Sequence, residues 1–239
     1  MKKRNKVGIM GGTFDPIHIG HLILGEAAYR QFHLDRIEFM PAGNPPHKLH
    51  REGRASDEER TGMVLRAIRS NPHFTLSRRE MNADGYSYTY RTLEKLRAEY
   101  PDTDYYFIIG ADSLFDFDTW REPQRIVDAC TLVVATRNQI APEDFDREIR
   151  RKRARYGGTF LKLDTPNLDI ASHVLRTMIR RGESVRYYIP DCVIDYINEH
   201  GIYRNVPEEG PDGDPLLSGE KIGRQSQNGK ILNRSCRML

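Results

Sequence analysis

The chain has 239 residues, 38% of them hydrophobic and 30% charged. This length fits one ordinary domain, since a single core serves up to roughly 250 residues. A net charge of +3 from 37 basic and 34 acidic side chains is too balanced to demand a nucleic-acid partner, though it allows a local basic pocket.

Apolar runs of strand length alternate with helical patterns along the chain. In chain order the patterns predict a strand over Val7–Met10, a helix over His18–Phe32, a strand over Arg36–Met40, a helix over Ser56–Ser70, a strand over Phe74–Ser77, a helix over Thr89–Tyr100, strands over Tyr105–Ile109 and Thr131–Ala135, a helix over Pro142–Tyr156, a strand over Thr159–Leu163 and helices over Ile170–Arg181 and Pro190–His200. Within these, Ser56 stands three residues before Glu59, the spacing of a capping box at a helix start. The alternation predicts an α/β fold, a doubly wound parallel sheet with helices on both faces.

The composition changes after Tyr203. From there on the sequence is rich in Gly, Pro, Ser and charged residues and has no sustained periodicity, which is typical of a disordered tail. We therefore expect a folded domain over residues 1–204 and a low-complexity tail over 205–239.

Targeting signals and cysteine usage indicate the compartment. The basic start MKKRNKVGIMGG has an apolar run far too short for a signal peptide, and no stretch approaches the roughly 18 apolar residues of a membrane span. Three widely separated cysteines favour reduced thiols over a disulfide framework. We expect a cytoplasmic protein without a membrane partner.

The stretch GIMGGTFDPIHIGHL, residues 8–22, raises the first functional question. Gly11, Gly12 and Thr13 follow the first predicted strand, where glycines let the backbone approach a phosphate and the next helix offers free N–H groups. His18 and His21 stand three residues apart on the predicted helix and therefore share a face. Gly20 between them leaves space for a ligand.

Two other interpretations of this stretch stay open from the residues alone. A glycine pair is often only a turn, and the two histidines could be partly buried helix residues. A zinc site is the other alternative, but no Cys or Glu stands at zincin spacing, and the His pairs of metalloproteases lie four residues apart with a Glu. We expect no metal site built by the protein.

The complete string is more specific than its parts. It resembles the GGxFDPxHxGH signature of the nucleotidylyltransferase superfamily, matched by Gly11, Gly12, Phe14, Asp15, Pro16, His18, Gly20 and His21. The resemblance implies a Rossmann-like fold of the HxGH type over 1–204, with His18 and His21 as catalytic residues. It also implies that ATP is bound at Gly11, Gly12, Thr13, Phe14 and Gly20.

Four further stretches narrow the resemblance. They are PAGNPPHK (41–48), GYSYTYRTLEKL (85–96), FIIGADSLFDFDTW (107–120) and DIASHVLR (169–176). Together with the first string, from about Val7 to Tyr203, they are similar to bacterial nicotinate-nucleotide adenylyltransferases, which join nicotinate mononucleotide to the AMP part of ATP. Two alternatives stay open: another adenylyltransferase of the superfamily, such as the phosphopantetheine enzyme, and a non-catalytic nucleotide-binding module.

The resemblance implies further site residues, several with a physical reason of their own. ATP would also meet Gly110, Asp112, Ser172 and Arg176, and the mononucleotide would meet Lys48, Thr89, Trp120 and Arg137. A carboxylate at a strand end, such as Asp112, can accept hydrogen bonds from ribose hydroxyls. The flat ring of Trp120 can stack on a planar ligand, although a core position is the ordinary expectation for a lone tryptophan. Lys48 follows a stiff double proline, although a solvated surface lysine is the ordinary expectation there.

Two features depart from, or compete with, this assignment. Where the family usually has DISST, this chain has DIASH, so that Ala171 replaces a serine with the loss of its hydroxyl donor, and His173 replaces a threonine. Backbone N–H groups at that helix start still favour an anion. The basic run REIRRKRAR (147–155) lacks interleaved aromatic residues and indicates a solvated helix face rather than a nucleic-acid site.

The reaction that the resemblance implies needs no protein nucleophile, because a phosphate monoester is already an anionic nucleophile. The protein has to position the reactants and neutralise the charge that grows on phosphate oxygens. Two imidazoles on one helix face can donate N–H groups to those oxygens. We expect Mg²⁺ to enter with ATP and to need few or no protein ligands. The expected partners are therefore ATP and nicotinate mononucleotide; the preference for acid over amide and the oligomeric state, a homo-oligomer included, stay open.

Overall fold

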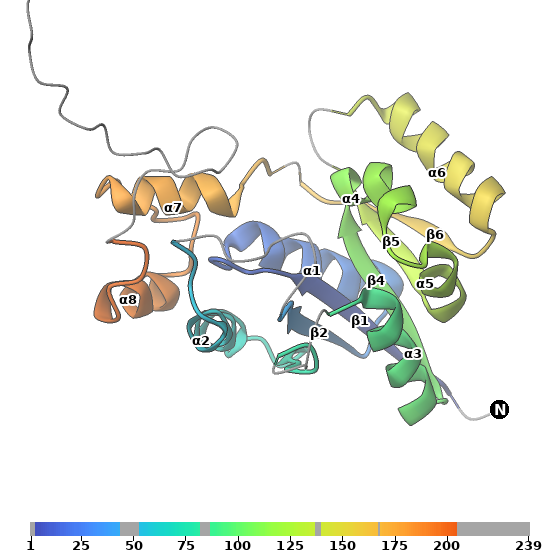
Figure 1. Ribbon diagram of the computed structural model, residues 1–239, viewed down its shortest axis with the longest axis horizontal. Helices are drawn as coiled ribbons and strands as arrows, with labels where there is room; N and C mark the ends of the chain where they lie inside the picture. Colours follow the sequence, from blue (N-terminus) through green and yellow to red (C-terminus); the bar gives the residue numbers. More distant parts are fainter. Residues whose placement is uncertain (1–2, 44–52, 82–86, 137–139, 167, 205–239) are drawn as a thin grey trace, which may run out of the picture.

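The computed structural model describes residues 3–43, 53–81, 87–136, 140–166 and 168–204 (Figure 1). Its centre is a sheet of parallel strands in the order β3-β2-β1-β4-β5-β6. The strands are β1 (Asn5–Gly12), β2 (Arg36–Pro41), β3 (Phe74–Leu76), β4 (Thr103–Gly110), β5 (Thr131–Ala135) and β6 (Phe160–Leu163). The predicted tail over 205–239, Lys48 and Arg137 lie outside the described residues.

The helices connect these strands and close the chain. They are α1 (Ile19–Phe32), α2 (Asp57–Ile68), α3 (Thr89–Glu99), α4 (Ala111–Phe115), the 3₁₀-helix η1 (Asp116–Thr119), α5 (Pro123–Ala129), α6 (Pro142–Tyr156), α7 (Ser172–Arg180) and α8 (Asp191–Glu199). No helix within the described ranges is long and apolar enough to cross a membrane.

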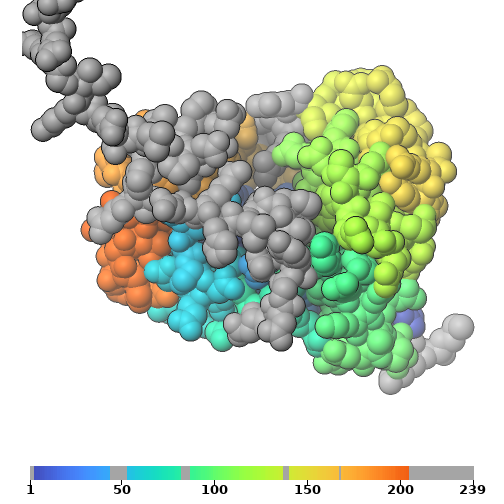
Figure 2. Space-filling model, viewed as in Figure 1, coloured from blue at the N-terminus to red at the C-terminus, as the bar shows by residue number. Residues whose placement is uncertain are grey.

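Both faces of the sheet are buried, which confirms the predicted doubly wound fold. Neighbouring side chains on a strand point to opposite faces, and Phe107 and Ile108 of β4 accordingly enter two different apolar clusters. The cluster around Ile108 is covered by helices α1, α2, α7 and α8, and the cluster around Phe107 by α3, α4, α5 and α6. In Figure 2, α2, α7 and α8 lie together on one side and α3 to α6 on the other.

The predicted strands and helices all recur, with shifts of a few residues at their ends. The capping box is confirmed: the Glu59 N–H donates to Ser56 Oγ at 3.2 Å, and the Ser56 N–H donates to Glu59 Oε2 at 2.7 Å. The prediction was wrong in leaving residues 111–129 without helices, where α4, η1 and α5 stand. Each of these is too short for its periodicity to be read from sequence.

The order of the strands determines where a ligand can bind. The chain runs from β1 outward through β2 to β3, then returns to place β4 on the other side of β1. Side by side, β1 ends at Gly12 and β4 at Gly110. Such a reversal leaves a crevice at the carboxyl ends of the two strands, which is the usual ligand position in open α/β sheets.

Candidate active site

The two histidines of the opening motif stand at the start of α1, directly beyond the end of β1. His18 is the N-cap residue, in extended conformation, and His21 is the third residue of the helix. Their rings are stacked, with centroids 3.7 Å apart and planes inclined by 30°. The prediction that the two imidazoles share one face is therefore confirmed.

A backbone hydrogen bond indicates the tautomer of His21. The His18 N–H donates to His21 Nδ1 at 3.3 Å, so Nδ1 acts as an acceptor. In the neutral ring the proton then sits on Nε2, the nitrogen at the far side of the ring. His21 thus caps its own helix with one nitrogen and is a hydrogen-bond donor with the other.

Both rings line a pocket of about 430 Å³, part of which is open to solvent. The lining also includes Gly20 and Gly110, so the pocket lies at the β1–β4 crevice. Its remaining walls come from α1, from the end of β5 and from the segment before α7: Ile23, Leu24, Ala135, Thr136, Thr165, Pro166, Leu168 and Ile170. The structure therefore brings together His18, His21, Gly20 and Gly110 among the predicted site residues.

Buried polar side chains hold the loop between β1 and α1 in place. Asp15 is 1% exposed, and its Oδ1 accepts hydrogen bonds from the Tyr203 hydroxyl at 2.6 Å and the Ala55 N–H at 3.1 Å. Arg176 Nη1 donates to the Asp15 carbonyl oxygen at 2.7 Å and lies 3.7 Å from Asp15 Oδ2. Burial and the nearby Asp15 carboxylate raise the pKa of Tyr203 well above its usual range, which keeps its hydroxyl a donor.

A second buried cation holds the same loop from the side of α2. Arg60 is 4% exposed and donates to the Thr13 carbonyl oxygen at 2.7 Å and the Ala42 carbonyl oxygen at 2.8 Å. It also contacts Asp57 Oδ1 at 2.6 Å. Sequence reasoning missed Arg60, and it matched Asp15 to the motif without giving a role to Asp15 or to Tyr203. Nothing in the sequence around Arg60 or Tyr203 points to a distant loop.

Several predicted ATP-binding residues support the loop through their side chains. The Phe14 ring is buried, lies edge-on to the His21 ring at 5.0 Å, and would be 3.1 Å from a Cβ added at Gly12. Ser172 Oγ donates to the Pro16 carbonyl oxygen at 3.0 Å, and Arg176 is buried beside Asp15. His173, which replaces the family threonine, is exposed.

Two of the residues predicted to bind the mononucleotide, Thr89 and Trp120, are described, and both belong to the face of the sheet that α3 and η1 cover. Thr89 is the first residue of α3 and is half-buried. Asp112, predicted to bind ATP, is exposed in α4. Trp120 follows η1, half-buried, with its ring edge-on to Phe107 at a centroid distance of 6.3 Å. Phe107 in turn would lie 3.2 Å from a Cβ added at Gly11, which connects Trp120 with the motif loop.

The described residues contain no group of three or more His, Cys, Asp or Glu side chains that could hold a metal ion. The donor set in the described part of the site is imidazole, hydroxyl and backbone N–H, which suits phosphate oxygens better than a bare cation.

Comparison with known proteins identifies the family. The Cytidylyltransferase-like family model matches residues 9–180. The chain is 40% identical over 198 residues to a protein of Lachnoclostridium phytofermentans named "Probable nicotinate-nucleotide adenylyltransferase", covering 83% of this chain and 98% of that relative. It is 41% identical over 201 residues to a protein of the same name from Synechococcus sp. strain JA-3-3Ab, covering 84% and 96%.

The solved structure of Plasmodium falciparum nicotinic acid mononucleotide adenylyltransferase complexed with NaAD has the same fold, with a TM-score of 0.70 at 19% identity over 83% of this chain and 97% of that one. The likeness to this structure concerns the fold alone, whereas the curated relatives match in sequence over nearly their whole length. The chain therefore belongs to the cytidylyltransferase-like family and, within it, to the nicotinate-nucleotide adenylyltransferases.

Proposed function

We propose that the reaction for which the curated relatives are named takes place at the pocket of His18 and His21. As a nicotinate-nucleotide adenylyltransferase, the chain transfers the AMP part of ATP to nicotinate mononucleotide, a step of NAD biosynthesis. The placement of the site rests on one observation above all: two stacked imidazoles line a pocket at the β1–β4 crevice together with Gly20 and Gly110.

The chemistry is an in-line displacement at phosphorus. A phosphate oxygen of the mononucleotide forms a bond to the α-phosphorus of ATP, while the bond from that phosphorus to the oxygen shared with the β-phosphorus breaks. The electron pair leaves with pyrophosphate, and nicotinate adenine dinucleotide forms. The protein has to hold the reactants in line and to stabilise negative charge on the phosphate oxygens.

The two imidazoles supply that stabilisation. His21 Nε2 is a donor because Nδ1 already accepts the His18 N–H, and both rings face the same pocket. Donors held in place in advance cost no reorganisation in the transition state. Asp15, Arg60, Arg176 and Tyr203 act behind them, because they hold the loop that places His18 at the helix start.

Mg²⁺ would enter this site on the phosphates of ATP, where it neutralises charge. The protein contributes no cluster of metal ligands among its described residues, so we place the ion on the nucleotide and assign no step to it.

The mononucleotide would bind between the ends of β4 and α3, with its pyridine ring on Trp120. Thr89 and Trp120 both lie on this side of β4, and Phe107 connects Trp120 to Gly11. Lys48 and Arg137 are proposed for the phosphate of the mononucleotide on family resemblance. ATP would then occupy the side of His18, and we propose that Gly110, which lines the same pocket, and Asp112 contact it.

Pyrophosphate release from ATP tests this proposal directly. We expect release with nicotinate mononucleotide, and a comparison with the amide mononucleotide measures the preference that the residues leave open. Release with phosphopantetheine alone would assign the chain to the neighbouring adenylyltransferase class. Binding of ATP without release under any of these conditions would indicate a nucleotide-binding module.

A further inference from the structure

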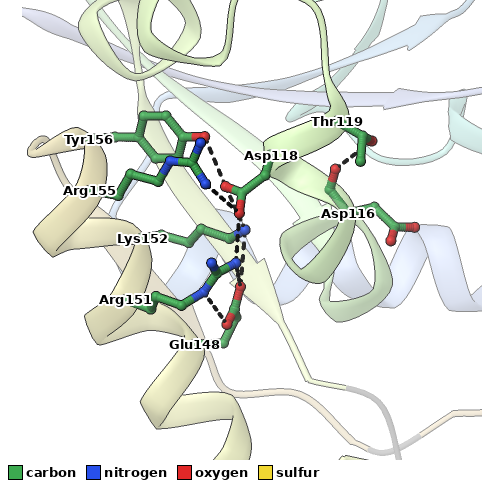
Figure 3. A network of polar contacts seen from close by, with 8 residues as sticks. All are labelled: Asp116, Asp118, Thr119, Glu148, Arg151, Lys152, Arg155 and Tyr156. Carbon is green, nitrogen blue, oxygen red and sulfur yellow. Dashed lines mark hydrogen bonds and ion pairs between the residues drawn. The ribbon is translucent and has the colours of Figure 1, made fainter.

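A cluster of charged side chains joins α6 to η1 (Figure 3), and none of its residues lines the pocket of the two histidines. At its centre Lys152 Nζ lies 2.9 Å from Asp118 Oδ1 and 3.0 Å from Glu148 Oε1. Around it Asp118 also contacts Arg151 at 2.7 Å and Arg155 at 3.0 Å, and it accepts a hydrogen bond from the Tyr156 hydroxyl at 2.8 Å.

Lys152 is the member of this cluster that requires an explanation. Its side chain is 0% exposed, whereas those of Arg151 and Arg155 are 50% and 54% exposed. A buried ammonium group loses its hydration, and pairing with two carboxylates often only offsets that loss. A methionine of similar length would fill the same space without the loss. Half-exposed ion pairs such as those of the two arginines contribute little to stability.

The ion pair of Lys152 and Asp118 fixes the position of η1 relative to α6. Asp118 is the third residue of η1, and Trp120 follows that short helix directly. The Trp120 N–H donates to the Phe117 carbonyl oxygen at 3.1 Å, and the rings of these two residues are 5.5 Å apart. The position of η1 therefore sets the position of the Trp120 ring.

Tyr156 strengthens the same connection from α6. Its hydroxyl binds Asp118, and its ring lies edge-on to the buried Phe117 ring at 5.7 Å. One carboxylate and one aromatic ring of η1 are thus held by neighbouring residues of α6. Burial raises the pKa of Asp118, but hydrogen bonds from Lys152, Tyr156 and Arg151 outweigh it and hold the pKa below its usual range, so the carboxylate stays charged.

We propose that Lys152 is a positioning residue, which through Asp118 fixes η1 and with it the Trp120 ring that receives the mononucleotide. The inference rests on the proposed function, because it assigns Trp120 to the pyridine ring of that substrate. If the proposal holds, Lys152 of α6 affects the affinity for the mononucleotide without contacting that substrate. The run REIRRKRAR thus combines an outward solvated face with three buried residues, Glu148, Ile149 and Lys152.

The test compares Lys152→Met with Arg147→Met. Arg147 lies on the same helix in an exposed ion pair with Asp144, so its replacement is the matched control. Trp120 is the single tryptophan of the chain, so its fluorescence reports this site without a label. In Lys152→Met we expect shifted Trp120 emission and easier quenching by acrylamide in the substrate-free protein, whereas Arg147→Met matches the wild type.

Kinetics supply the second readout. We expect Lys152→Met to raise the KM for nicotinate mononucleotide about tenfold, with kcat and the KM for ATP changed by less than about twofold, because only one substrate loses its preset contact. Tyr156→Phe keeps the ring against Phe117 and removes one donor to Asp118, so the same changes are expected at a smaller size. That variant carries the test if Lys152→Met does not fold.

Two results would overturn the proposal. One is Trp120 emission and a mononucleotide KM in Lys152→Met equal to those of Arg147→Met. The other is a uniform loss of activity with both KM values unchanged, which indicates a structural role alone. A wild-type protein that does not use nicotinate mononucleotide would refute the proposed function instead, while the emission comparison still reports whether Lys152 positions Trp120.

Discussion

His21 performs two tasks with one ring. Its Nδ1 accepts the His18 N–H and thereby closes the start of α1, as a glutamate does in an ordinary capping box. In the neutral ring Nε2 then carries the proton, and the residue lines the pocket. The ring is kept in place by stacking on His18 and by the edge contact with Phe14.

Replacement of this ring is therefore expected to affect turnover more than folding. For His21→Ala we expect kcat to fall about 10²-fold or more, the usual loss for a transition-state donor, and His18→Ala to act similarly. Pyrophosphate release measures the change, and circular dichroism checks the fold. His33→Asn is the control: His33 is exposed at the opposite end of α1 with φ at 51°, a conformation that asparagine tolerates. Near-normal turnover in both alanine variants would remove the histidines from the mechanism.

Trp120 is expected to act on one substrate only. Loss of a stacking ring costs about 1–3 kcal/mol in comparable aromatic sites, so Trp120→Ala should raise the KM for nicotinate mononucleotide by about 5- to 150-fold and leave the KM for ATP nearly unchanged. Trp120→Phe keeps a flat ring and should lose less. Steady-state kinetics with each substrate varied separately measure this. A rise confined to the KM for ATP would reverse the assignment of the two substrates.

At the scale of elements, two helices and the chain's last described residues contact the same loop. Arg60 of α2, Arg176 of α7 and Tyr203 each bind a backbone or side-chain oxygen of residues 13–15. The loop precedes α1, so these contacts place His18 relative to Gly110 across the crevice. Segments far apart in sequence thus determine the geometry of a motif that is local in sequence.

The Tyr203 contact has a pH dependence that can be measured. Its folded-state pKa is raised, so its contribution to stability is fully present below the unfolded-state pKa near 10 and is lost as the pH rises through the higher folded-state pKa. We expect Tyr203→Phe to lower the free energy of unfolding by about 1–3 kcal/mol at neutral pH. Urea unfolding should show this difference narrowing above about pH 10. If the difference in the free energy of unfolding between the two proteins did not change with pH, the hydrogen bond that the Tyr203 hydroxyl donates to Asp15 would not be its source.

At the scale of the whole molecule, two apolar clusters pack on the two faces of the sheet and supply most of the stability. The ion cluster of α6 and η1 makes the free energy of unfolding depend on pH in the acid range. The pKa of Asp118 and that of Glu148 are both lowered in the folded state. For Glu148 the main cause is the hydrogen bond from Arg151. Their contribution is therefore present above the ordinary carboxyl pKa near 4 and is lost as the pH falls below it.

The lowered pKa values of these two carboxyl groups can be tested by unfolding the protein at acid pH. Between about pH 5 and about pH 3 we expect the wild type to lose more free energy of unfolding than Asp118→Asn, because the amide has no proton to gain. Asp144→Asn, which removes a carboxylate from the exposed pair with Arg147, should behave like the wild type. Urea unfolding at each pH measures the three proteins. Parallel loss in the wild type and Asp118→Asn would show that the cluster does not set the acid response.

The amino-acid sequence by itself determined the layers of the fold and the reactive motif. Apolar runs and helical periods are local, and so the α/β alternation, the His18–His21 pair and the glycines beside it could be read without coordinates. The family followed from the same local strings and agrees with the curated relatives.

Only the tertiary structure decided which distant side chains support these strings. Nothing near Arg60, Tyr203 or Lys152 in sequence indicates that each is buried against an oxygen of a remote segment, and α4, η1 and α5 were too short to predict. The physical reason is that a buried ion pair or hydrogen bond depends on where the sheet places two elements. Periodicity along one element carries no information about that distance.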